Sequence, residues 1–343
     1  FGNTILEYYT RVFDELLEFI KKVAKKRLKI FSGNKVHLTT LFLITLIAIL
    51  IRVNFLFQPI RYDEAVTFMN FASKPLYIGL SSYPVPNNHL FHTFLVHIAY
   101  TFLGNSPWVI RLPALIAGIL EVPATYLATR VLYNKHAGLL SASFIASSSV
   151  LIEFSTNARG YTILILFSLL LLTLSRYIIK TSNLGAWFLF SIFSAFGAYT
   201  IPIMLFPFFG ILIWVVISIG FRGDSRKKIT HKFFNLSVAL AHTGLWTLIL
   251  YAPVLIVSGP NSLFNNRFVD ELTWSSFIEK VIPLSLSIYN QWTRDIPVFL
   301  VLILIIGIKT FILLHSKITT HKLPIFFALI FTITKIRKLQ NII

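Results

Sequence analysis

Long apolar stretches of about 20 residues recur along the chain, and short segments rich in Lys and Arg separate them. A stretch of this length crosses the roughly 30 Å hydrocarbon core of a bilayer as an α-helix. We predict an all-α fold, a polytopic transmembrane bundle of about eight spans, with a truncated ninth span left open in the C-terminal segment 323–343. The eight predicted spans cover residues 38–57, 109–127, 139–154, 161–179, 186–199, 203–219, 236–257 and 296–314.

The composition agrees with an integral membrane protein. Of the 343 residues, 56% are hydrophobic and 13% are charged, whereas soluble domains carry about 25% charged residues. The absence of Cys excludes disulfides, thiolate chemistry and Cys-ligated metals. The net charge of +18 would suit a nucleic-acid partner, but the basic residues lie in short loops between apolar runs, and we therefore exclude nucleic acid.

The distribution of Lys and Arg predicts the orientation in the membrane. Residues 1–35 form a basic amphipathic segment in which Leu6, Phe13 and Leu17 recur at helical spacing, and such a helix lies on an anionic, cytoplasmic membrane surface. A second basic cluster at 222–232 falls on the same side. The protein is thus expected in the cell (inner or plasma) membrane, with a cytoplasmic N-terminus.

This orientation divides the transmembrane domain, residues 36–322. Segments 58–106 and 258–295 become extracytoplasmic. In the first of them, residues 66–72 and 89–103 are expected to form helices at the membrane interface, separated by a Pro-, Ser- and Asn-rich stretch.

Adjacent carboxylates, Asp63 and Glu64, follow the first span in a chain that has only 13 acidic residues. A carboxylate in a partly desolvated cleft retains enough basicity to accept a proton, and an adjacent acid increases it. Both are therefore candidate catalytic residues. The alternative is that Asp63 is the N-cap of a short helix over 63–72.

Arginines are expected on the same face. Arg111 lies at the outer end of the second span, and Arg159 lies in the turn between the third and fourth spans. Guanidinium groups bind phosphate in bidentate fashion, so these residues suit a substrate whose anionic phosphate lies among the lipid headgroups. Arg111 could instead extend to the interface without binding substrate.

Four short motifs, in this order and spacing, resemble the GT-C superfamily of membrane glycosyltransferases, which includes protein O-mannosyltransferases and lipid A aminoarabinose transferases. The resemblance is greatest to bacterial dolichyl-phosphate-mannose-type transferases and covers roughly residues 38–220. The motifs are Tyr62-Asp63-Glu64-Ala65, Asn88-His89-Leu90-Phe91, Arg111-Leu112-Pro113-Ala114 and Asn157-Ala158-Arg159-Gly160-Tyr161.

The resemblance implies a polyprenyl-phosphate-linked sugar donor and transfer to an acceptor hydroxyl on a lipid, glycan or protein, with inversion, on the extracytoplasmic face. It also implies that Asp63 is the base and that Arg159 lies near the donor phosphate. The expected substrate-binding residues are Arg159, Arg111, Asn88, His89, Tyr161 and Glu153.

The chain departs from the family at Asn157, where relatives often carry Glu. Either Glu153, one helical turn earlier, substitutes for that acid, or the acid is dispensable in this chain.

Other interpretations compete with this one. A transporter or flippase for a lipid-linked saccharide would also need outer-face arginines, but it should show ionisable groups along a path across the membrane. A non-catalytic scaffold gives no reason for the paired acids. His89 and His92 have metal-ligand spacing, yet no metal and no cofactor are predicted. Glu121, inside the second span, is either functional or hydrogen-bonded between helices.

Overall fold

The computed structural model describes residues 2–32, 35–264 and 273–293. Within these ranges the regular elements are all helices, as the sequence predicts, and no strand is present. The chain forms two compact units, residues 1–263 and residues 264–343. The described part of the second unit contains α14 (Trp274–Thr293), and the site described below lies entirely within the first unit.

Five helical segments among the described residues are long and apolar enough to cross a membrane. A sixth is obtained if α7 (Lys135–Ser147) and α8 (Ser149–Ser155), which meet at 64°, form one broken span. The five segments are α2 (Lys35–Asn54), α6 (Pro107–Leu132), α9 (Tyr161–Lys180), η2 with α11 (Pro202–Gly220) and α12 (Arg226–Val257).

Within the described ranges these spans number five or six, whereas seven of the eight predicted spans fall there. The expected span over 186–199 is α10 (Leu184–Thr200), whose 17 residues make it a shorter apolar helix. The expected span over 296–314 and the C-terminal segment 323–343 lie outside the described residues.

Helix α6 is central to the first unit and contacts α5 (Leu90–Leu103), α7, α8 and α9. Small residues on its buried face, including Ala114, Ala117 and Gly118, allow these neighbours to approach closely. Helix α9 continues the packing onto α10 and α11, and α10 packs against α12. The close packing of α6 gives its polar side chains fixed surroundings.

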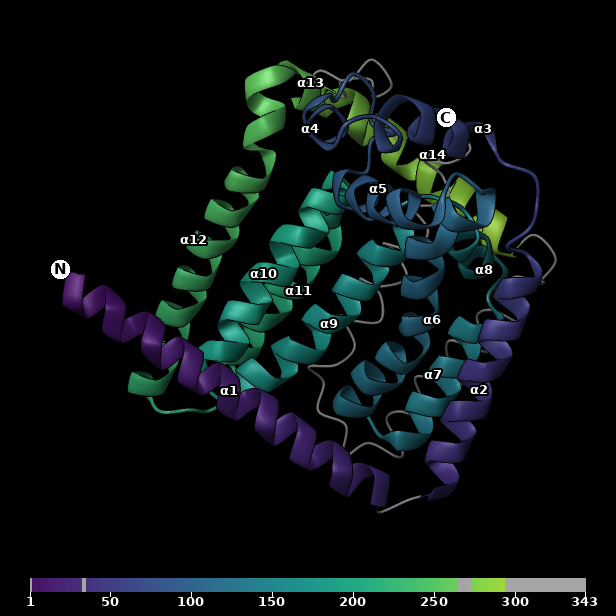
Figure 1. Cartoon of the computed structure of the whole chain (residues 1–343). Coiled ribbons are helices and arrows are strands. Elements are labelled where there is room, and N and C mark those ends of the chain that lie inside the picture. Colours follow the sequence, from purple (N-terminus) through teal and green to yellow (C-terminus); the bar gives the residue numbers. More distant parts are fainter. Residues whose placement is uncertain (1, 33–34, 265–272, 294–343) are drawn as a thin grey trace. The chain divides into compact units, whose positions relative to one another are not determined.

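Four short helical elements lie at one end of the first unit, and α1 (Gly2–Ser32) runs across the helices near the other end (Figure 1). The four elements are α3 (Tyr62–Thr67), the π-helix η1 (Phe68–Ala72), α4 (Leu76–Ser81) and α5 (Leu90–Leu103). Helices were predicted over 66–72 and 89–103, and both are present. Helix α4 was not expected, because Pro and Ser suggested a loop; in the structure Pro75 is its N-cap.

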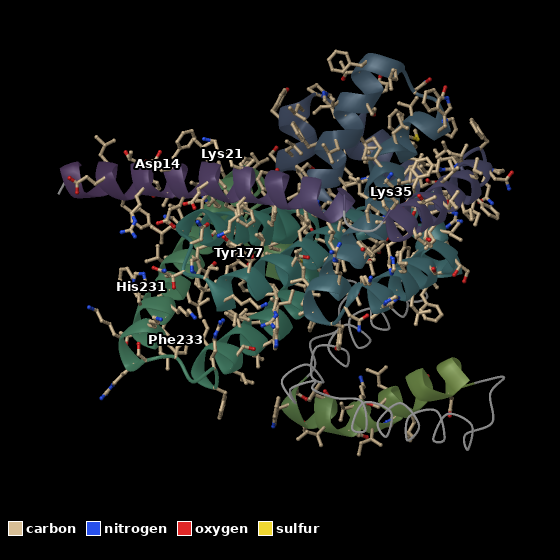
Figure 2. All side chains as sticks on the ribbon, turned by 90° about the horizontal axis from the view of Figure 1, so that it is seen from below. Asp14, Lys21, Lys35, Tyr177, His231 and Phe233 are labelled. Carbon is tan, nitrogen blue, oxygen red and sulfur yellow. The ribbon has the colours of Figure 1, made fainter. Side chains whose placement is uncertain are left out.

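Helix α1 (Gly2–Ser32) confirms the predicted N-terminal helix. The Glu15 carboxylate accepts the backbone N–H of Leu184 at 2.6 Å, and Phe19 packs on Tyr177 with ring centroids 4.8 Å apart. Figure 2 shows α1, with Asp14 and Lys21 labelled, crossing the bundle. Its helical stripe of Leu6, Tyr9, Phe13, Leu17 and Ile20 remains exposed.

Candidate active site

The two adjacent acids begin helix α3, and they occupy different environments. Arg61 is the N-cap, so Asp63 is the second residue of the helix and Glu64 the third. The Glu64 carboxylate reaches back to the backbone N–H of Arg61 at 2.8 Å. The alternative that Asp63 is the N-cap is therefore wrong, and the capping contact is made by Glu64.

Glu64 forms a fully buried ion pair with Arg111 of α6. The pair is bidentate, because Nε of Arg111 donates to Oε1 at 2.7 Å and Nη2 donates to Oε2 at 2.6 Å. Two parallel charge-assisted bonds hold both the distance and the orientation of the two side chains. This pair joins α3 to the central helix of the unit.

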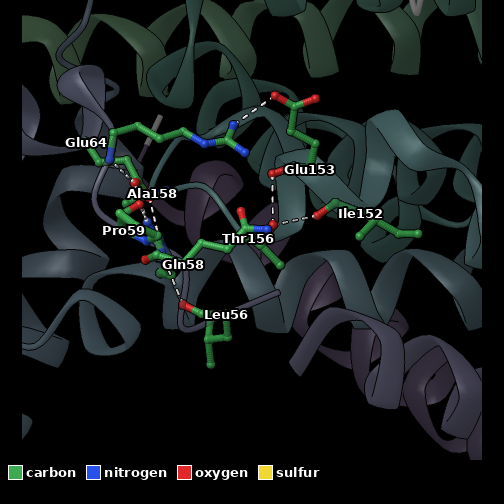
Figure 3. A network of polar contacts seen from close by, with 10 residues as sticks. Leu56, Gln58, Pro59, Glu64, Ile152, Glu153, Thr156 and Ala158 are labelled. Carbon is green, nitrogen blue, oxygen red and sulfur yellow. Dashed lines mark hydrogen bonds and ion pairs between the residues drawn. The ribbon is translucent and has the colours of Figure 1, made fainter. Parts of the chain in front are cut away.

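Arg111 also binds the chain that leads from α2 into α3. Its Nη1 donates to the carbonyls of Leu56 and Gln58, each at 2.7 Å, and its Nη2 donates to the carbonyl of Pro59 at 2.9 Å (Figure 3). Together with the two bonds to Glu64, these contacts occupy all five guanidinium donors. In this arrangement Arg111 has no donor left for a phosphate.

The remaining contact of Glu64 reaches the turn between α8 and α9. Its Oε1 accepts the backbone N–H of Ala158 at 2.7 Å (Figure 3). The carboxylate thus accepts four hydrogen bonds, from the side chain of Arg111 and the main chain of Arg61 and Ala158. Since a carboxylate has about four acceptor positions, Glu64 is saturated.

Asp63 contrasts with its neighbour. Its side chain is partly exposed, and it makes no hydrogen bond or ion pair with any residue in the described part of the chain. A carboxylate with free acceptor positions at the end of the bundle can receive a proton from an incoming hydroxyl. The dipeptide therefore contains one saturated acid and one free acid.

Arg159 is buried, with 3% of its surface exposed, yet it is only partly paired. Its Nη2 donates to Oδ1 of Asn87 at 3.3 Å, and the guanidinium lies 5.7 Å from the ring centroid of Tyr161. Its Nη1 is buried without a hydrogen-bond partner in the described structure. Buried donors without a partner are costly, so an anionic ligand at Nη1 would satisfy them.

His89 and Gly160 fix the main chain beside Arg159. Nδ1 of His89 accepts the backbone N–H of Gly160 at 2.8 Å, and its ring meets that of Tyr161 edge-on at 5.2 Å. Burial, followed by the charge of Arg159, lowers the pKa of His89 well below its usual value. The imidazole is therefore neutral at pH 7, as its acceptor role requires.

Asn88 is an internal bridge. Its amide donates to the carbonyls of Gly79 and Ser82, each at 2.8 Å, and its oxygen accepts the hydroxyl of Thr93 at 2.8 Å. With both N–H donors used, the side chain holds the loop between α4 and α5.

Other polar groups surround Arg159. Burial raises the pKa of Tyr83 to about 12, and the nearby charge of Arg159 opposes this shift. Among the residues that the structure describes, both ring nitrogens of His92 and Oδ1 of Asn157 are buried without partners. Sequence reasoning missed the roles of Asn87 and Tyr83. Asn87 directly precedes the motif Asn88-His89-Leu90-Phe91, whereas nothing in the sequence singled out Tyr83.

Glu153 lies on α8 at the surface. Its side chain is 51% exposed and pairs with Nη1 of Arg61 at 2.8 Å. The predicted substrate role of Glu153 remains a hypothesis. Glu121 is fully buried in α6, and neither carboxylate oxygen has a hydrogen-bond partner within the described ranges. Of the two alternatives for Glu121, hydrogen bonding between helices finds no partner in that part of the chain.

No group of three or more His, Cys, Asp or Glu side chains that could hold a metal ion occurs in the described part of the protein. His89 instead contacts the main chain, because its Nδ1 accepts the backbone N–H of Gly160 and holds that turn.

Comparison with protein families identifies the class of this protein. The model of one family matches residues 86–256, from the polar motif before α5 to the last turn of α12. The chain is a membrane glycosyltransferase that uses a lipid-linked sugar donor. It belongs to the dolichyl-phosphate-mannose-protein mannosyltransferase family, a GT-C family, as its motifs predict.

The matched region contains Arg111 and Arg159, whereas Asp63 and Glu64 precede it. The identification favours the enzyme over the transporter and the scaffold. No curated protein matches the chain.

Proposed function

We propose that this enzyme transfers a sugar from a polyprenyl-phosphate donor to an acceptor hydroxyl on the extracytoplasmic face of the membrane, with inversion at the anomeric carbon. The observation that supports the proposal is a difference in hydrogen bonding among two acids and two arginines. The hydrogen-bonding atoms of Glu64 and Arg111 are all occupied, by each other and by main-chain groups, while Asp63 and Arg159 keep free hydrogen-bonding atoms.

In this proposal Asp63 is the general base. Its carboxylate takes the proton from the acceptor hydroxyl as the oxygen attacks the anomeric carbon of the donor. The new glycosidic C–O bond forms while the bond from that carbon to the phosphate oxygen breaks. A single displacement of this kind inverts the configuration and releases the polyprenyl phosphate.

Arg159 acts on the leaving group. Its unpartnered Nη1 can donate two hydrogen bonds to the phosphate, whose negative charge increases as the bond breaks. The site is buried, so the interaction is stronger than it would be in water. Asn87 and Tyr161 orient the guanidinium for this role.

Glu64 and Arg111 are positioning residues in this scheme. The sequence suggested a catalytic role for Glu64 and phosphate binding for Arg111. Because all their hydrogen-bonding atoms are in use, we assign them a different role. They hold the start of α3, which carries Asp63, close to the turn that carries Arg159. Asn88 and His89 likewise support the site through Gly79, Ser82 and Gly160.

The test compares glycolipids and glycoproteins by mass spectrometry in cells that lack the protein and in cells that express it. Wild type should add a glycoconjugate, and Asp63→Asn should reduce its formation by about 10²- to 10⁴-fold, the range for loss of a positioned base. Tyr62→Phe, at a neighbouring residue that is 82% exposed, is the matched control and should retain activity. Full transfer by Asp63→Asn would rule out Asp63 as the base.

A further inference from the structure

Arg52 is a second fully buried arginine, and it lies outside the four motifs of the site. It lies in the last turn of α2, and its Nε donates to Oγ of Ser155 at 3.0 Å. Its Nη1 donates to the carbonyl of Ala146 at 3.1 Å, and its Nη2 donates to the carbonyl of Ile145 at 3.2 Å. The guanidinium therefore contacts both sides of the break between α7 and α8.

The two carbonyls belong to the last turn of α7, which ends at Ser147. The last four carbonyls of a helix have no partner within it, and a carbonyl that is buried without a partner is destabilising. Arg52 satisfies two of them at the place where the chain bends by 64°. A lysine has a single nitrogen and cannot reach Ile145, Ala146 and Ser155 together.

Ser155 connects this contact to α6. Its hydroxyl accepts from Arg52 and donates to the carbonyl of Leu151. A Cβ added at Gly118 of α6 would lie 2.0 Å from Oγ of Ser155. The absence of a side chain at Gly118 is what allows Ser155 to occupy this position.

We propose that Arg52 is a positioning residue for the donor site, acting through the bend between α7 and α8 on the turn that carries Arg159. Two connections lead there. Ser155 is followed within four residues by Arg159. Phe154 packs on Tyr161 with ring centroids 4.9 Å apart, and Tyr161 in turn faces the Arg159 guanidinium. The inference rests on the proposed role of Arg159 in holding the donor phosphate.

The first experiment measures transfer by Arg52→Lys in the purified full chain. We expect a loss in kcat/KM for the polyprenyl-phosphate donor of about 10²-fold, the scale of a 1 Å misplacement, with KM for the acceptor unchanged. Arg130→Lys is the matched control, because Arg130 also lies in the last turn of a candidate span, and it should behave as wild type.

A double-mutant cycle identifies the route. If Arg52 acts through Arg159, then Arg52→Lys should reduce activity by less than about threefold in an Arg159→Lys background, because interacting residues are not additive. An equal fold-loss in both backgrounds would overturn the inference.

A second measurement is independent of activity. Nitroxide labels at exposed positions Tyr62 on α3 and Ser149 on α8 report how α8 lies relative to α3. Arg52→Lys should shift or broaden the distance distribution, whereas Arg130→Lys should not. If Arg52→Lys does not accumulate in the membrane, Ser155→Ala, which removes a single oxygen atom, replaces it in both experiments.

The activity measurement and the distance measurement test the proposed function and the role of Arg52 separately. Absence of transfer by the wild-type protein would contradict the proposed function, while the label distances would still test the positioning by Arg52. An unchanged distance distribution in the variant would overturn the inference whatever the activity.

Discussion

The carboxylate of Glu64 accepts the backbone N–H of Ala158 at 2.7 Å. This bond links the residue next to Asp63 with the residue next to Arg159, although the two segments are 94 positions apart in the sequence. Arg111 holds the same carboxylate from α6. The proposed base and the proposed phosphate ligand are thus attached to one buried, saturated ion pair.

Glu64→Gln should destabilise the protein by about 3–5 kcal/mol, because it leaves the buried guanidinium of Arg111 without its counter-charge. Chemical unfolding in detergent micelles measures the loss. The matched control is Glu153→Gln, which breaks the exposed pair with Arg61 and should cost less than about 1 kcal/mol. Equal effects of the two variants would contradict the structural role of Glu64.

Arg159→Lys should weaken binding of polyprenyl phosphate roughly 10- to 100-fold. The variant keeps the positive charge but loses the planar fork, and a hydrogen bond to a charged group contributes about 1.5–3 kcal/mol. Binding of the sugar-free lipid to purified protein measures the effect. Arg61→Lys, at the surface pair, is the control, and unchanged affinity in Arg159→Lys would remove Arg159 from the donor site.

Gly160→Ala should destabilise the turn beside Arg159. The added Cβ would lie 2.7 Å from Cγ2 of Thr200 and 3.2 Å from Cβ of His89, and such overpacking typically costs about 1–3 kcal/mol. Gly220→Ala is the matched control, since a Cβ there meets nothing within 4 Å. Thermal unfolding of the two variants should separate them, and similar midpoints would argue against close packing at Gly160.

His89 predicts a pH dependence of stability. Because the pKa of His89 is lowered in the folded protein, the unfolded chain binds the proton more readily. The contribution of neutral His89 to the unfolding free energy is therefore complete above about pH 6.5, the usual pKa of histidine, and is lost as the pH falls below that value. His89→Asn should therefore reduce the fall in unfolding free energy between pH 7 and pH 5, and an unchanged slope would contradict this assignment.

The proposed topology can be tested by single-cysteine labelling, because the chain contains no Cys. Tyr62→Cys, at an exposed position beside Asp63, should react with an impermeant reagent in intact cells. Lys227→Cys, in the second basic cluster, should react only after permeabilisation. The reverse pattern would place the site on the cytoplasmic side.

The sequence by itself determined the helical character of the chain, most of its apolar segments and its family. These properties depend on local composition and on short motifs, such as Asn157-Ala158-Arg159-Gly160-Tyr161, that can be read without knowing which segments meet. The length of each helix was less predictable. Span 186–199 proved to be a 17-residue helix, and α4 formed after Pro75 where a loop was expected.

Only the tertiary structure decided which charged residues are free to bind. In the sequence Asp63 and Glu64 look equivalent, as do Arg111 and Arg159. Glu64 and Arg111 are 47 positions apart in the sequence, and in the structure they neutralise each other. The carbonyls that accept the remaining guanidinium donors of Arg111 come from the segment before α3. Whether a charge is saturated depends on partners that only folding brings together, and for that reason the sequence identified the candidate residues but not their roles.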